Sequence, residues 1–145
     1  MPIQVNFKMD EGCTDLRPHK QHVGDSGFDL KSRVSTVLKR GKFMNVPTGL
    51  FLELPLNTEA QVRPRSGLAA RLGITVLNTP GTVDASYRGE VQVILINHGE
   101  QDFIINRGDR IAQLVIQTIP EIDFVEQDSL NDTDRGKGGF GSTGR

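Results

Sequence analysis

One short segment of the 145-residue chain, residues 78–91, combines a carboxylate, a phenol ring and a guanidinium: Asp84, Tyr87 and Arg88. An aspartate is ordinarily ionised at neutral pH, so Asp84 could orient and polarise a water molecule as a general base. Tyr87 is the only tyrosine in the chain and could supply a stacking ring. The alternative is a plain surface hairpin with an incidental aspartate, and the segment alone does not decide between the two.

Turn signals and flanking apolar runs predict how this segment is presented. Turn-forming residues stand near its two ends: Asn78, Pro80, Gly81 and Gly89. Apolar runs at residues 74–77 and 91–96 flank the segment and predict two buried strands. We therefore expect a tight hairpin, in which a rigid β scaffold presents the polar side chains.

Two other segments carry groups that could bind an anion. Arg65, Ser66 and Gly67 supply a guanidinium, a hydroxyl and backbone N–H groups at the start of a predicted helix, residues 66–72, with Ser66 as its N-cap. Five of the eleven residues from 135 to 145 are glycine, and glycine-rich backbone can wrap phosphates closely. The alternatives are a capped helix with a solvated arginine, and a flexible tail.

Two further polar residues stand out at their positions. Asp29 follows a glycine turn, and an acid beside an anion site suggests a water ligand of Mg²⁺, which is usually held by phosphate oxygens and keeps much of its hydration shell. Gln113 interrupts an apolar strand, where it needs hydrogen-bond partners if it is buried. The simpler interpretations are a turn-capping aspartate and a glutamine bonded to neighbouring backbone.

The remaining pattern predicts an all-β subunit that must position these residues. About ten short strands are expected, with residues 66–72 as the one helix, so the fold should be a sandwich, jelly roll or barrel. Besides the two strands that flank the hairpin, the strand-like stretches are residues 3–8, 34–38, 43–46, 49–54, 61–64, 103–105, 111–119 and 122–125. We expect one β domain over residues 1–134 and a flexible glycine-rich arm over residues 135–145.

Composition and charge exclude several classes of function. The net charge of −1 gives no electrostatic case for stable binding to nucleic acid or to an anionic membrane. The single cysteine, Cys13, excludes an internal disulfide, and the three histidines lack transition-metal spacing. No apolar run is long enough to span a bilayer, and the N-terminus lacks the apolar core of a signal peptide. We expect a soluble, cytoplasmic protein.

Five segments, in this order along the chain, together resemble the five motifs of the trimeric dUTPase (dUTP diphosphatase) family. They are residues 24–30, 64–69, 81–91, 107–114 and 135–144. The resemblance implies a distorted jelly-roll (β-clip) subunit in a homotrimer with active sites at the subunit interfaces. It also implies Mg²⁺-dependent hydrolysis of dUTP to dUMP and pyrophosphate, which limits uracil incorporation into DNA and supplies dUMP for thymidylate synthesis.

The resemblance also assigns roles to single residues. Asp84 is similar to the residue that activates the water attacking the α-phosphorus, and Asp29 to the acid that holds water ligands of the Mg²⁺–triphosphate. The phosphate-binding group would be formed by Arg65, Ser66, Gly67 and Gln113.

The uracil-reading hairpin would consist of Asn78 and the backbone of Gly81, Thr82, Val83 and Asp84, with a further contact at Gln92. Tyr87 is similar to the ring beneath the deoxyribose that leaves no room for a 2′-hydroxyl. In the arm, Arg135 would clamp the γ-phosphate, Phe140 would cover the uracil, and Gly141, Ser142 and Thr143 would wrap the phosphates.

Two other functions are compatible with such a fold. A dCTP deaminase shares it but uses a glutamate for deamination and lacks the Asp84-x-x-Tyr87 pairing in this form. A non-catalytic binding or signalling module would keep the nucleotide pocket without turnover. The presence of Asp84, Asp29, Ser66 and Arg135 argues against the module.

Overall fold

The computed structural model describes residues 1–144 and is almost entirely β, as the sequence predicts. It contains ten strands, one short α-helix and one 3₁₀ turn. The strands are β1 (Asn6–Met9), β2 (Phe28–Lys31), β3 (Thr36–Leu38), β4 (Phe43–Glu53), β5 (Thr58–Arg63), β6 (Ile74–Val76), β7 (Gly81–Val83), β8 (Glu90–Asn97), β9 (Phe103–Ile105) and β10 (Arg110–Thr118), with η1 (Thr14–Leu16) and α1 (Ser66–Leu72).

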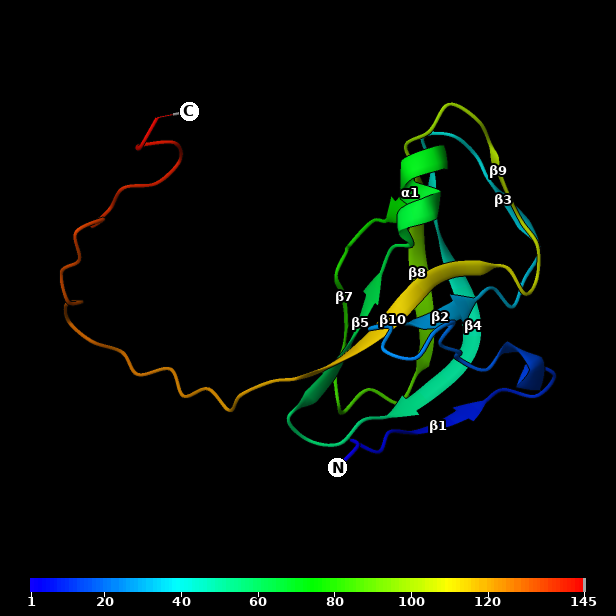
Figure 1. The fold of residues 1–145 in the computed structure, drawn as a ribbon, viewed down its shortest axis with the longest axis horizontal. Helices are drawn as coiled ribbons and strands as arrows, with labels where there is room; N and C mark the ends of the chain where they lie inside the picture. The colour runs from blue at the N-terminus through cyan, green and yellow to red at the C-terminus, as the bar shows by residue number, and fades with distance from the viewer. Residues whose placement is uncertain (145) are drawn as a thin grey trace.

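The strands form three antiparallel sheets. Two are four-stranded, in the orders β1-β4-β8-β6 and β2-β10-β5-β7, and the third is the pair β3-β9. Figure 1 shows α1 at one end of this body, while the C-terminal segment leaves β10 and runs away from the sheets. Neighbours in the sheets are distant in sequence, which is typical of a jelly roll.

The core follows the two-residue period of the strands. On β5, Ala60 and Val62 are buried while Glu59, Gln61 and Arg63 are partly exposed, and on β8 the residues Val91, Val93 and Leu95 are buried. Each large apolar side chain buried in this way contributes about 1.5–3 kcal/mol. These inward faces hold the two larger sheets together.

Strand β4 is one long strand, although the sequence predicts two pieces. Its pairing with β8 is irregular between Pro47 and Phe51, and Gly49 lies there with φ of 74°. A positive φ suits glycine and is typical of a bulge, so the strand bends and continues. The bulge also turns the Gly49 N–H toward Glu90, to whose Oε2 it donates a hydrogen bond of 2.8 Å.

Two predicted strands differ from the structure at the ends of the chain. The first begins only at Asn6, and Ile3 and Phe7 remain 53% and 48% exposed, beside an apolar cavity of about 590 Å³. The strand predicted at residues 122–125 is absent, and Phe124 is exposed. An alternating pattern needs a strand edge to pair with: Phe7 pairs with Leu52 of β4, but residues 122–125 have no strand partner among the described residues.

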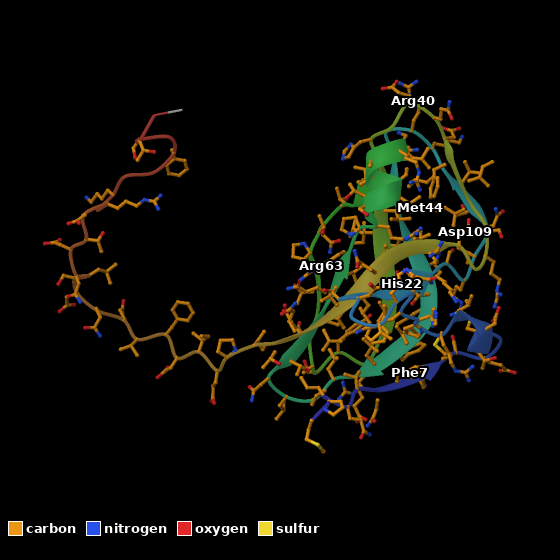
Figure 2. All side chains as sticks on the ribbon, in the orientation of Figure 1. Phe7, His22, Arg40, Met44, Arg63 and Asp109 are labelled. Atoms are coloured by element: carbon orange, nitrogen blue, oxygen red, sulfur yellow. The ribbon has the colours of Figure 1, made fainter. Side chains whose placement is uncertain are left out.

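The C-terminal segment has no regular secondary structure between residues 119 and 144. Figure 2 shows its side chains spread along a path that stands apart from the sheets. Arg145, the last residue of the predicted arm, lies outside the described residues. The flexibility of the arm and its role therefore stay predictions.

One exposed ion pair ties the turn before β10 to the N-terminal part of the chain. The Arg107 guanidinium donates to both Asp15 carboxylate oxygens, at 2.7 and 2.9 Å, and to the Gly12 carbonyl oxygen at 2.8 Å. The hydrogen bond from Arg107 lowers the pKa of Asp15 from 3.8 to about 2. Two-pronged geometry makes this pair stronger than most surface pairs.

We predict that Asp15→Asn destabilises the protein at neutral pH and that this difference fades in acid. Because the folded pKa of Asp15 is lowered, its contribution is complete above the unfolded value of 3.8 and is lost as the pH falls toward about 2. Urea unfolding of both proteins between pH 3 and pH 7 measures the effect. A difference that does not shrink below pH 3.8 would contradict the prediction.

Candidate active site

Strand β10 aligns a row of polar residues across three strands. Gln113 is paired with Asp29 on β2 and with Arg63 on β5. Directly paired residues project from the same face of a sheet, so these three side chains share one face. Three segments that are far apart in the sequence therefore meet here.

Gln113 has the partner that its position in an apolar strand demands. Its Nε2 donates to the Pro64 carbonyl oxygen at 3.0 Å, which links β10 to the residue just before Arg65. Gly27 allows this placement, because a Cβ at position 27 would collide with Gln113 Oε1 and lie 3.0 Å from its Cβ. The glycine that precedes Asp29 by two residues is thus a packing requirement.

Asp29 is held on one side of its carboxylate. Oδ2 accepts a 2.7 Å hydrogen bond from Gln21 Nε2 and lies 3.6 Å from Arg110 Nη1, while Oδ1 accepts no hydrogen bond from residues 1–144. The Asp29 side chain is only 13% exposed. Gln21 carries no motif signal in the sequence, and Arg110 lies in the fourth motif-like segment without an assigned role, so only the fold reveals both contacts.

The start of α1 differs from the prediction in one respect. The N-cap residue is Arg65, with extended backbone (φ −89°, ψ 129°) and no side-chain capping bond, so Ser66 is the first helical residue and not the cap. The extended chain leaving β5 turns directly into the helix at Arg65. The Ser66 hydroxyl is therefore not used in capping, and the first N–H groups of the helix lack intrahelical partners.

Near Arg65, the arginine side chains outnumber the carboxylates. Arg65 Nη1 donates to the Arg110 carbonyl oxygen at 3.0 Å, and the Arg71 guanidinium folds over Gly67, where a Cβ would lie 2.9 Å from Nη2. Burial lowers the pKa of Arg65, and the nearby Arg110 and Arg71 lower it further. The Asp29 carboxylate raises the pKa of Arg65 and so offsets part of this decrease. We call Asp29, Arg65, Arg110 and Gln113 the β10 cluster; its surplus of positive charge favours an anion.

The predicted tight hairpin over residues 78–91 is wrong in its details. Strands β6 and β8 pair antiparallel, as expected of hairpin arms, but the connection between them is long. Within it, β7 pairs with β5 in the other sheet, Gly81 opposite Val62 and Val83 opposite Ala60. Backbone N–H and C=O groups need hydrogen-bond partners. The edge of β5 supplies such partners to β7, which a tight turn between β6 and β8 would not do.

The connection presents polar groups on a tightly packed backbone. Gly81 and Val83 are buried and Thr82 is exposed. A Cβ at Gly81 would lie 3.3 Å from both Asn78 Nδ2 and Val62 Cβ, so the Asn78 amide rests against the backbone of β7. We call Asn78, residues 81–84 and Tyr87 the β7 cluster.

Asp84 and Tyr87 lie next to each other in a turn after β7. The Tyr87 N–H donates to the Asp84 carbonyl oxygen at 3.1 Å, and the exposed Asp84 carboxylate has no hydrogen-bond partner among residues 1–144. The Tyr87 hydroxyl donates to the Glu90 carbonyl oxygen at 2.9 Å. Gln92 is exposed on β8, with its Nε2 3.4 Å from Glu90 Oε1.

A single chain does not bring all predicted site residues together. In the sheet β2-β10-β5-β7, three strand spacings separate Asp29 from β7, roughly 14 Å. The arm lies apart from both clusters, and its Arg135 Nε donates to the Gly138 carbonyl oxygen at 2.7 Å while Phe140 is exposed (Figures 1 and 2). The β10 cluster, the β7 cluster and the arm are thus three separate parts.

The described residues contain no group of three or more His, Cys, Asp or Glu side chains that could hold a metal ion. Asp29 is a lone carboxylate with one oxygen left for a further partner. Such a donor fits contact with a hydrated Mg²⁺ through water, provided that a ligand supplies the other oxygens.

Together, these elements define an all-β jelly roll with a cationic cluster beside a carboxylate. Residues 16–144 match the model of the dUTPase family. A deoxyuridine 5′-triphosphate nucleotidohydrolase of Gloeothece citriformis is 56% identical over 129 residues, 89% of each chain. The chain therefore belongs to the dUTPase family.

Solved structures agree with this at the level of the fold. A mutant dUTPase of Staphylococcus bacteriophage 80alpha, with dUpNHpp, has a TM-score of 0.88 at 22% identity and covers 98% of this chain and 99% of its own. A mutant dUTPase from phage phi11 of S. aureus, whose structure concerns a structural Mg(II) ion, has a TM-score of 0.76 at 22% identity, with 86% and 98% covered.

We predict that Gly27→Ala displaces the Gln113 side chain and breaks its bond to Pro64, while the protein stays folded. The flexible end of Gln113 can move, so the cost should be about 1 kcal/mol of unfolding free energy, that of one hydrogen bond. Urea unfolding measures it, and Gln117→Ala, an exposed change on the same strand, is the control. If Gly27→Ala and Gln113→Ala act through one contact, the double variant should lose less unfolding free energy than the two single variants added together. Additive losses would contradict the prediction.

Proposed function

We propose that this protein hydrolyses dUTP to dUMP and pyrophosphate by attack of water on the α-phosphorus. The observation that carries the proposal is that Gln113 pairs with Asp29 across β10 and β2 and donates a hydrogen bond to the Pro64 carbonyl oxygen. These come from three of the five motif-like segments. The family assignment adds the substrate class.

The β10 cluster suits a triphosphate. Arg65 and the N–H groups of Ser66 and Gly67 offer a cation and donors, and Gln113 stands in the same row as Asp29. Mg²⁺ held mainly by the substrate phosphates, with Asp29 contacting it through water, would neutralise charge that develops on attack. From the arm, Arg135 would bind the γ-phosphate and residues 141–143 would surround the phosphates.

The β7 cluster suits a deoxyuridine. Uracil would meet the Asn78 amide and the backbone from Gly81 to Asp84, with a further contact at Gln92. A cytosine amino group would face N–H donors where uracil offers an acceptor, and such unpaired buried groups can cost a factor of about 10⁴ in specificity. Tyr87 would lie beneath the deoxyribose, and Phe140 would cover the base.

Asp84 is the proposed general base. Its carboxylate is exposed and unpaired among residues 1–144, so it is free to accept a hydrogen bond from the attacking water. In the proposed step the water oxygen bonds to the α-phosphorus, Asp84 takes the water proton, and pyrophosphate leaves.

A homotrimer would complete the site. The β10 cluster, the β7 cluster and the arm are separate in one chain, so neighbouring subunits would have to combine them. Closure of the arm would then expel water. No helix within residues 1–144 has the length and apolar character to cross a membrane; the cytoplasmic location stays a prediction.

Pyrophosphate release from dUTP, dTTP, dCTP and UTP tests the substrate. We expect turnover of dUTP far above that of the other three. Ammonia release from dCTP would support a deaminase instead, and tight dUTP binding without turnover would support a non-catalytic module.

We predict that Asp84→Asn retains dUTP binding but lowers kcat by about 10²–10⁴, the usual contribution of a general base. The amide keeps the size of the side chain and loses its ability to accept a proton. Steady-state kinetics and calorimetric binding measure the two effects. Glu100→Gln, an exposed carboxylate change 3.9 Å from Arg40, is the control; near-normal turnover in Asp84→Asn would remove this residue from the role.

Deleting residues 135–145 should leave a folded trimer whose kcat/KM for dUTP is lower by on the order of 100-fold or more, because a cation and the cover over the base are lost. Light scattering and thermal unfolding check that assembly and stability are retained. Full activity in this truncated protein would show that the arm takes no part in closure.

A further inference from the structure

We propose that Arg33 and Glu90 are positioning residues that hold the Tyr87 ring and thereby set the preference for deoxyribose over ribose. This inference rests on the proposed role of Tyr87 beneath the sugar. Arg33 lies outside all five motif-like segments, and Glu90 lies in the third without an assigned role. Their importance emerges only from the contacts around the ring.

The Tyr87 ring is anchored at its hydroxyl end. The hydroxyl donates to the Glu90 carbonyl oxygen at 2.9 Å, and the ring packs against the Gly89 backbone, where a Cβ would lie only 2.5 Å from Cζ. A side chain at position 89 would therefore push the ring away. The ring is still 46% exposed, and among residues 1–144 its hydroxyl has one hydrogen-bond partner, the Glu90 carbonyl oxygen.

The Glu90 side chain is in turn held by two hydrogen-bond donors. Oε2 accepts hydrogen bonds from Arg33 Nη1 and from the Gly49 N–H, both at 2.8 Å. The Glu90 side chain is 17% exposed, so water competes little for these bonds. The Gly49 donor exists because of the bulge in β4.

Arg33 is itself held rigidly. Nη1 also donates to Asp10 Oδ2 at 3.0 Å, and the Arg33 N–H donates to the Pro47 carbonyl oxygen at 2.9 Å. The Asp10 N–H donates to the Gly49 carbonyl oxygen at 2.8 Å, which closes the network around the bulge. Hydrogen bonds to Glu90 and Asp10 raise the pKa of Arg33, consistent with a permanently charged anchor.

A continuous chain of contacts thus runs from the β4 bulge through Glu90 to the phenol. A ring can exclude a single added hydroxyl only if it cannot move aside, because the 2′-hydroxyl is small. If the Glu90 side chain lost its hydrogen bonds to Arg33 and Gly49, the Glu90 backbone that holds the Tyr87 hydroxyl would become more mobile. Ribose would then be tolerated before dUTP turnover is lost.

The test compares kcat/KM for dUTP and UTP in the wild-type protein, Glu90→Gln and Arg33→Met. We expect the UTP-to-dUTP ratio to rise about tenfold or more in both variants, mainly through a lower KM for UTP. Arg33→Lys, which keeps a cation near Glu90, should recover part of the discrimination. Arg107→Met removes an exposed arginine with equally short carboxylate contacts elsewhere and should leave the ratio unchanged.

Tyrosine fluorescence supplies a readout that does not depend on activity. The chain has one tyrosine and no tryptophan, so this emission comes from Tyr87 alone. Its anisotropy should fall in Glu90→Gln and Arg33→Met, because the ring becomes more mobile, and should be unchanged in Arg107→Met.

Tyr87→Phe should raise the UTP-to-dUTP ratio, and adding Glu90→Gln to it should have little further effect.

An unchanged UTP-to-dUTP ratio in both variants would overturn the inference, as would an equal rise in Arg107→Met, which would indicate general softening. If the wild-type protein does not hydrolyse dUTP, the proposed function fails separately. In that case the dissociation constants for dUTP and UTP replace kcat/KM in the same comparison, and an unchanged ratio or unchanged anisotropy still overturns the inference.

Discussion

Strand β10 pairs with β2 on one side and with β5 on the other, and the β10 cluster depends on this double register. Gln113 lies opposite both Asp29 and Arg63. A slip of one residue in either pairing would put Gln113 and its partner on that neighbouring strand on opposite faces of the sheet. The bond from Gln113 to Pro64 then places the start of α1 beside the same row.

The bulge in β4 helps to position Tyr87 in the β7 cluster, through Glu90. Gly49 leaves the regular pairing with β8, and its N–H and the Arg33 guanidinium both bind the Glu90 carboxylate. Each half of the proposed site therefore has its own hydrogen-bond network, although β7 and β10 belong to one sheet. In that sheet Asp29 lies three strand spacings from β7, which is the reason for proposing that neighbouring subunits combine the two clusters.

Local patterns predicted part of this fold well. The helix at residues 66–72 and the strand at 103–105 have the bounds that the sequence indicates, because local turn and apolar signals define them. The strand predicted at residues 122–125 is absent, since alternation alone supplies no partner edge. Ser66 is not an N-cap, because the chain turns into the helix one residue earlier.

For the site, the sequence by itself determined which chemical groups are present and, through five ordered segments, the family to which the chain belongs. Tertiary structure alone decided the neighbours of these groups. Gln21 reaches Asp29, and Arg33 reaches Glu90, from segments without any motif signal. The physical reason is that strand pairing and the β4 bulge bring together residues that are distant along the chain, and no local pattern records contacts of that range. The segment from Asn78 to Val91 thus supplies one half of the proposed site, and its geometry is set by β5 and β4.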